Sequence, residues 1–167
     1  MEQVLSLLTR RPSAVLFLGD GLRDFEVLTD RHPELSTYAV AGNCDASLIF
    51  PPDEPPVRTL FLDGVTVVMM HGHTHDVRYG LGSAIRYAAE READVLLFGH
   101  THLPYERTLA AGTEIEGGRT YGPLVLKKPL TVANPGSIGQ PRDGNGPCFG
   151  VLTVRGGTVL FSHGHLS

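Results

Sequence analysis

The chain has 167 residues, of which 41% are hydrophobic and 19% are charged, and its formal net charge at pH 7 is -4. This length and balance suit one domain with a sizeable core, so we expect residues 1–167 to form a single domain. The net negative charge excludes the broad basic surface that non-specific binding of extended nucleic acid requires, so any nucleic-acid ligand would be a small substrate.

Two features of the sequence favour a reducing, cytoplasmic setting. The amino terminus carries Glu2 where a signal peptide would have a positive region, and no long apolar stretch follows. No apolar run approaches the roughly 20 residues that a membrane-spanning helix needs, so we expect no membrane partner. The two cysteines, Cys44 and Cys148, are then free thiols. A homo-oligomer stays open.

In the first hundred residues, the apolar pattern predicts alternating strands and helices. Helical spacing of leucine and valine predicts a helix over residues 1–10, which Pro12 ends. The apolar run at residues 14–18 predicts a strand buried on both faces. The elements expected next are a helix over 22–28, an extended segment over 37–40, a hairpin of strands 58–62 and 65–70, a helix over 83–93 with Ser83 as its N-cap, and a strand over 95–98.

Strands dominate the rest of the chain. A glycine-rich loop over residues 111–122 precedes an expected strand at 130–133 and the loop NPGSIGQPRDG. A hairpin over 149–162 is expected to turn at Gly156-Gly157, and His163 and His165 would then lie in a mobile tail. The alternation of elements predicts an α/β fold.

Polar side chains that can bind metal follow four separate apolar strands. Because ligands bind at the carboxyl ends of the strands in open α/β sheets, side chains at these ends can converge in one crevice. His100 and His102 stand two residues apart, so both imidazoles point to the same side of an extended segment. The candidate ligands are Asp20, Asn43, His71, His100 and His102.

The donor types favour a first-row metal ion. Imidazole, carboxylate and amide donors together suit manganese, iron, nickel or zinc, whereas a calcium site would take more oxygen ligands. Two neighbouring ions bridged by a short carboxylate such as Asp20 can clamp a phosphoryl group and lower the pKa of a bound water. Taken singly, Asp20 or Asn43 would more simply be a turn residue, and His71 a hydrogen-bonded histidine. Only the expected convergence of these side chains at the strand ends indicates a metal site.

Five motifs in this order resemble those of a known family: LGD at 18–20, GNCD at 42–45, HGH at 71–73, GHTH at 99–102 and NPGS at 134–137. The sequence resembles the calcineurin-like metallophosphoesterases, and most closely the YfcE-like phosphodiesterase branch. The resemblance implies a four-layer α/β/β/α sandwich with a binuclear metal site at the strand ends. It also implies hydrolysis of phosphodiesters by a metal-activated water, with two divalent ions, manganese first and iron, nickel or zinc as alternatives.

The resemblance also implies roles for the metal ligands. Asp20 would bridge the two ions, and His102 would belong to the first site. The second site would be completed by Asn43, His71 and His100.

Four residues are candidates for contact with a small phosphodiester substrate. Cys44 stands where many relatives carry a histidine proposed to protonate the leaving group, and a neutral thiol could donate that proton less readily. Asn43 and His73 are candidate phosphate contacts, with a plain surface role equally open for His73. Arg142 follows the NPGS motif and could also bind phosphate, or be an ordinary solvated arginine.

The sequence departs from the family at its start, because members begin with a strand that ends in Asp-x-His and serves the first metal. No such motif precedes Asp20. Three interpretations stay open: an incomplete amino terminus, a one-metal or weakened enzyme, or a non-catalytic module. Loss of an interior strand would expose backbone donors and acceptors on two neighbours, which favours the first interpretation, although a partner strand or dimer contact could fill the gap.

Two other functions compete with phosphoester hydrolysis. The segment HGHTHD at 71–76 resembles the His-x-His-x-Asp-His motif of metallo-β-lactamase-fold hydrolases, but its last two positions are swapped and GNCD and GHTH would go unexplained. The retromer scaffold subunit shares the expected fold and uses it chiefly as a protein-binding surface. Retention of the other ligands argues against that loss of catalysis, and metal-dependent turnover separates the two functions.

Overall fold

The computed structural model describes residues 1–45, 54–116 and 122–166, and no helix in these ranges is long and apolar enough to cross a membrane. The helices are α1 (Glu2–Leu7), α2 (Leu22–Arg31) and α3 (Gly82–Glu90), together with a short 3-10 turn, η1 (His73–His75). The strands are β1 (Ala14–Phe17), β2 (Ser36–Ala39), β3 (Val57–Leu62), β4 (Val65–Met70), β5 (Val95–Phe98), β6 (Pro104–Leu109), β7 (Glu114–Ile115), β8 (Leu124–Val125), β9 (Leu130–Pro135), β10 (Cys148–Arg155) and β11 (Thr158–His165).

The main sheet has the strand order β3-β4-β5-β9-β6. Its three central strands, β4, β5 and β9, run parallel, and the edge strands β3 and β6 are antiparallel to their neighbours. Both faces of the three central strands are largely buried. Alternate residues of β4 and β5 pack into two different hydrophobic clusters, one of which includes α3. Burial on both sides explains why β4 and β5 are continuous apolar runs.

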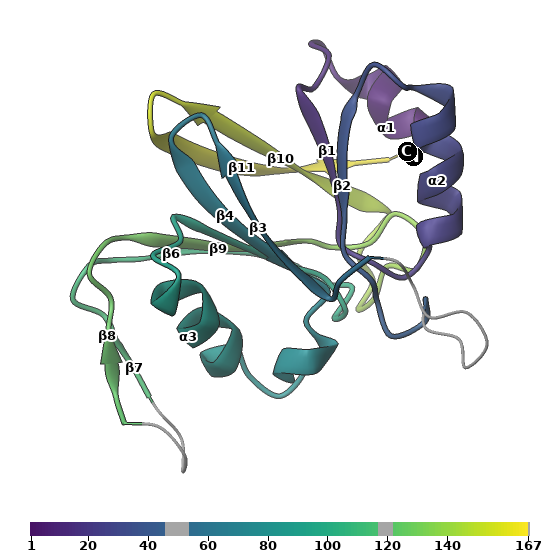
Figure 1. The fold of residues 1–167 in the computed structure, drawn as a ribbon. Coiled ribbons are helices and arrows are strands. Elements are labelled where there is room, and N and C mark those ends of the chain that lie inside the picture. Colours follow the sequence, from purple (N-terminus) through teal and green to yellow (C-terminus); the bar gives the residue numbers. More distant parts are fainter. Residues whose placement is uncertain (46–53, 117–121, 167) are drawn as a thin grey trace.

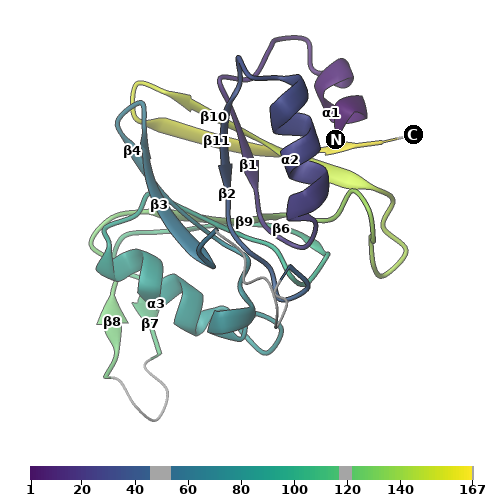
Figure 2. The same cartoon turned by 45° about the vertical axis from the view of Figure 1, so that its right-hand side comes forward.

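Two smaller sheets pack against the other face of the main sheet. β1 and β2 form a parallel pair, and β10 and β11 form an antiparallel hairpin. Side chains from both pairs join the second hydrophobic cluster, and α1 and α2 cover the opposite side of β1 and β2 (Figures 1 and 2). The mixed α/β fold predicted from the sequence is confirmed. The continuous four-layer sandwich stays a prediction, since these two pairs are separate two-stranded sheets among the described residues.

Several predicted elements need correction. Ser83 is not the N-cap of α3, because the helix begins at Gly82 and its N-cap is Leu81. His163 and His165 do not lie in a tail, because β11 continues to His165 and pairs with β10. The strands β6, β7 and β8 were not predicted. The PYERTL sequence of β6 exposes its polar residues at the edge of the sheet, so the strand lacks a long apolar run.

We predict that Leu96→Ala lowers the free energy of unfolding by about 2–5 kcal/mol, because it leaves a cavity in the packed interior. Leu96 lies in β5 and is 0% exposed, whereas Leu160 in β11 is 64% exposed. Leu160→Ala is therefore the control, with an expected change within about 1 kcal/mol. Urea unfolding measures both values, and equal losses would contradict the assigned core.

Candidate metal centre

Four of the five predicted ligands meet where strands of two sheets end. Asp20 follows β1, His71 directly follows β4 and His100 follows β5. One ligand atom from each of these three side chains lies within 4.8 Å of the other two. Asn43 joins them from the loop after β2, because its Oδ1 lies 3.1 Å from Nε2 of His71. The convergence expected from strand ends is therefore present for these four side chains.

His71 is held so that one ring nitrogen faces this cluster. Its Nδ1 lies 2.6 Å from the carbonyl oxygen of Leu18, which can only accept, so Nδ1–H donates. In a neutral imidazole Nε2 then carries a lone pair. That nitrogen lies 3.1 Å from Nδ1 of His100 and 3.3 Å from Oδ2 of Asp20.

This set of atoms fits a divalent ion. The Asp20 carboxylate, the Asn43 amide oxygen and Nε2 of His71 are all acceptors, and acceptors repel one another unless a cation or proton lies between them. Zinc–nitrogen and zinc–oxygen bonds of about 2.0–2.2 Å allow two ligands of one ion to lie about 3–4 Å apart. The His71 bond to a backbone carbonyl is also the outer-shell contact that metal-binding histidines usually have.

The two histidines are neutral near pH 7, as metal ligands must be. Burial lowers the pKa of the His71 ring, although the Leu18 carbonyl and Asp20 oppose that shift. Burial lowers the pKa of His100 to about 4, with smaller contributions from His71 in its protonated form and from the positive charge of Arg78. Both rings therefore keep a lone pair available near neutral pH.

Three predicted ligands have a left-handed backbone. The φ angles are 62° for Asp20, 64° for His100 and 61° for His102. Such a conformation costs about 1–3 kcal/mol for a residue other than glycine, and it persists only where surrounding contacts hold it. The backbone is thus strained at the residues whose side chains are candidate ligands.

A buried side chain braces the loop that carries His100 and His102. Asn134, at the end of β9, is 0% exposed. Its Nδ2 donates to the carbonyl oxygen of Gly99 at 2.9 Å and to Oγ1 of Thr101 at 3.1 Å. Nε2–H of His163 in β11 donates to the backbone oxygen of Asn134 at 2.8 Å. His163, which the sequence had suggested lay in a tail, thus supports this loop from a neighbouring sheet.

The other predicted site residues lie around the cluster. His102 is outside the three-residue group, and its Nδ1–H donates to the backbone oxygen of Gln140 at 2.8 Å. The ring of His73 lies 5.2 Å from that of His71, and its buried Nδ1 has no hydrogen-bond partner among the described residues. Cys44 donates its backbone N–H to Oδ1 of Asp20 at 2.8 Å. Arg142 is exposed in the loop before β10, and its side chain makes no ion pair with a described residue.

Three residues that act on this site were not predicted from the sequence: Arg78, Asp45 and Asn134. Arg78 is exposed, and its positive charge contributes to the pKa of both Cys44 and His100. Asp45 binds the loops that carry Asp20 and Asn43, and Asn134 binds the histidine loop. Asp45 and Asn134 were visible as members of the GNCD and NPGS motifs. Arg78 had no local signal, since an arginine in a polar loop is usually solvated.

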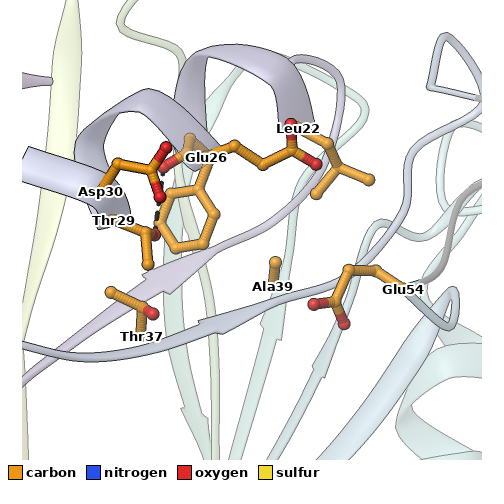
Figure 3. Close-up of a pocket in the computed structure, with 8 residues that line it drawn as sticks. Leu22, Glu26, Thr29, Asp30, Thr37, Ala39 and Glu54 are labelled. Atoms are coloured by element: carbon orange, nitrogen blue, oxygen red, sulfur yellow. Dashed lines mark hydrogen bonds between the residues drawn. The ribbon is translucent and has the colours of Figure 1, made fainter. Parts of the chain in front are cut away.

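The fold also has a cavity, which lies away from the candidate metal centre. It has a volume of about 180 Å³ and lies between α2 and β2. Figure 3 shows Glu26, Asp30 and Glu54 around it, with Ala39 and Thr37 on β2. None of the residues that line it is a predicted ligand, so the candidate centre lies at the strand ends and not in this cavity.

Comparison with known proteins identifies the family. The calcineurin-like phosphoesterase superfamily domain matches residues 1–157. The chain belongs to this superfamily. It is 32% identical over 155 residues to the probable metallophosphoesterase YsnB of Bacillus subtilis, a match that covers 92% of this chain and 78% of YsnB.

The chain is also similar to a curated phosphodiesterase in sequence and to a solved structure in fold. The chain is 29% identical over 118 residues to the phosphodiesterase YfcE of Escherichia coli, covering 68% of this chain and 50% of YfcE. A crystal structure of a Vps29 variant from Entamoeba histolytica superposes with a TM-score of 0.64 at 19% identity, covering 100% of this chain and 90% of that one. The Vps29 likeness shows the fold alone.

We predict that Gly42→Ala disrupts the centre, because its added Cβ would lie 2.1 Å from Oδ1 of Asp20 and 2.5 Å from the Asp20 nitrogen. The expected cost is about 1–3 kcal/mol of unfolding free energy, together with weaker binding of manganese. Gly139→Ala is the control, since a Cβ there meets no atom within 4 Å. Urea unfolding and manganese titration by electron paramagnetic resonance measure the two effects. Wild-type manganese binding by the Gly42 variant would contradict the assigned close contact.

Proposed function

We propose that this chain hydrolyses small phosphodiesters with divalent metal ions held at the strand ends. The observation that carries the proposal is the convergence of acceptor atoms from Asp20, Asn43 and His71 beside His100. Such a group of acceptors is stabilised by a cation, and the donor types suit a first-row ion. Membership of the phosphoesterase superfamily supports the reaction class.

We infer two metal positions, in keeping with the resemblance to the YfcE-like branch. Asp20 would contribute to both positions, with Asn43, His71 and His100 completing one and His102 belonging to the other. Manganese is the ion to test first, with iron, nickel and zinc as alternatives. When bound, these ions supply Lewis acidity toward a phosphoryl oxygen and lower the pKa of a water molecule.

Cys44 is the proposed proton donor to the leaving oxygen. Burial and the neighbouring Asp20 carboxylate raise the pKa of its thiol. The thiol therefore stays protonated at neutral pH and has a proton to give. A thiol is a weak acid, so diesters with good leaving groups are better substrates for it than monoesters with poor ones.

His73 and two arginines are the proposed contacts of the phosphate group, together with Asn43. The buried Nδ1 of His73 lacks a partner among the described residues, and a phosphate oxygen would accept from it if it carries the proton. Arg142 was predicted from the sequence, and Arg78 is added because its positive charge acts to lower the pKa of both Cys44 and His100. Guanidinium groups bind phosphate through paired hydrogen bonds.

The proposed setting is the cytoplasm, with a small phosphodiester as the partner. Both cysteines, Cys44 and Cys148, are free thiols, as a reducing compartment would keep them. Measuring the thiol content of the protein purified from its own cells without reductant tests this setting. A content of two thiols per chain is expected.

The deciding experiment is hydrolysis of bis-p-nitrophenyl phosphate with added manganese. We predict that His100→Ala abolishes the metal-stimulated rate, because a ligand is lost, while leaving the fold intact. His75→Ala is the control, since His75 lies in η1 outside the ligand group and should keep wild-type turnover. Circular dichroism verifies folding, and a chelator should remove the activity of the wild type.

Two results would contradict this proposal in different ways. An unchanged rate in the His100→Ala variant would overturn the site assignment. Bound manganese without turnover by the wild type would favour the alternative function, a catalytically weakened or inactive protein-binding module of the same fold. The Vps29 likeness agrees with that alternative at the level of the fold.

We predict that Arg78→Ala raises KM for the diester by about 10–100-fold, because a charge-assisted hydrogen bond to phosphate contributes about 1.5–3 kcal/mol. The value of kcat should change less. Arg142→Ala is measured beside it, and steady-state kinetics separates KM from kcat for both variants. A rise in KM with Arg142→Ala alone would assign the phosphate contact to Arg142.

A further inference from the structure

The carboxylate of Asp45 accepts hydrogen bonds from four backbone N–H groups. Its Oδ2 accepts from the nitrogens of Asp20 and Gly42, both at 2.8 Å. Its Oδ1 accepts from Gly21 at 2.7 Å and from Leu22 at 2.9 Å. One side chain thus ties the loop after β1 to the loop after β2, and these loops carry the candidate ligands Asp20 and Asn43.

The bonds to Gly21 and Leu22 also cap α2. Gly21 is the N-cap of this ten-residue helix and supplies no side chain to its free N–H groups. Asp45 supplies the missing acceptor from another loop, and its negative charge faces the positive end of the helix dipole. Burial alone would raise the pKa of Asp45, but the four N–H bonds outweigh it and lower the pKa. The carboxylate is therefore charged at neutral pH.

The remaining contacts converge on Asp20. Asp45 holds the Asp20 nitrogen, and the adjacent Cys44 N–H donates to Oδ1 of Asp20 at 2.8 Å. Asp20 is thus held at its backbone and at one carboxylate oxygen by two consecutive residues. Its other oxygen, Oδ2, faces Nε2 of His71. These bonds support the left-handed conformation of Asp20, which is costly without them.

We propose that Asp45 is a positioning residue, which sets the orientation of the Asp20 carboxylate toward the metal ions; this inference rests on the proposed function. A residue that only capped α2 would affect folding stability and leave metal binding unchanged. A positioning residue affects the affinity for the ion and the geometry of its ligands as well. Outer-shell partners of metal ligands typically change affinity by about 10–100-fold when they are lost.

The test compares Asp45→Asn with Asp94→Asn. Asp94 is a matched control, because its carboxylate also accepts a backbone N–H, from Thr66 at 2.8 Å, and binds Lys128 at 2.6 Å. It precedes β5, at the end of the strand opposite to His100. Cobalt is the probe, because its visible absorption reports both binding and ligand geometry, and urea unfolding measures stability.

We expect both substitutions to lower stability. Only Asp45→Asn should weaken cobalt binding, by about 10–100-fold, and change the visible spectrum of the bound ion. Asp45→Glu serves as a second variant, because it keeps the negative charge near α2 but moves the carboxylate one methylene further from its own backbone. It should fold and bind cobalt more weakly than the wild type.

The outcomes separate this inference from the proposed function. The positioning role would be overturned if a folded Asp45→Asn or Asp45→Glu protein bound cobalt with the affinity and spectrum of the wild type. That result would not contradict the metal centre. Failure of the wild-type protein to bind cobalt would overturn the metal centre, and the positioning role with it. Weakened binding by the Asp94 variant to the same extent would also overturn the inference, since general loss of stability would then explain the effect.

Discussion

The candidate centre depends on the hydrogen bond from Nδ1 of His71 to the carbonyl oxygen of Leu18. Leu18 follows β1 and His71 follows β4, so this bond joins the ends of two sheets that pack face to face. It also selects the tautomer, because a neutral ring that donates from Nδ1 keeps its lone pair on Nε2. That lone pair faces Asp20 and His100. If the ring turned, the Nε2 lone pair would no longer face Asp20 and His100.

The loops around this bond contain residues in an unfavourable left-handed conformation, and hydrogen bonds to neighbouring side chains stabilise them. Asp20, His100 and His102 have left-handed φ angles. The Asp45 carboxylate holds the first loop, and the Asn134 amide holds the loop of the two histidines. Strain of this kind at chemically active residues is common in functional sites, where the surrounding structure over-determines an unfavourable conformation. Here the core provides rigid strands, and the hydrogen bonds orient the side chains at their ends.

The most accurately predicted elements are the strands in which every residue is surrounded by the core. The bounds of β4 and β5 were predicted to the residue, because strands buried on both faces are short, continuous apolar runs. The predicted bounds were wrong, or the strand was not predicted, where exposed and buried residues are mixed along the strand. β6 lies at a sheet edge and has polar, exposed residues, and the hairpin of β10 and β11 extends three residues further than its apolar pattern. The N-cap of α3 was placed at Ser83, but α3 begins one residue earlier without a side-chain cap.

The sequence alone determined the α/β fold class and the polar residues that end the strands, since apolar runs and the residues that stop them are local patterns. Four of the residues that it predicted as ligands, Asp20, Asn43, His71 and His100, lie close together in the structure. Only the tertiary structure decided that His102 lies outside that group and that Asp45 and Asn134 brace it. These contacts join residues 25 to 38 positions apart, and the bond between His71 and Leu18 joins residues 53 positions apart. They depend on loop conformations that hydrogen bonds between distant segments select, and no local pattern encodes them.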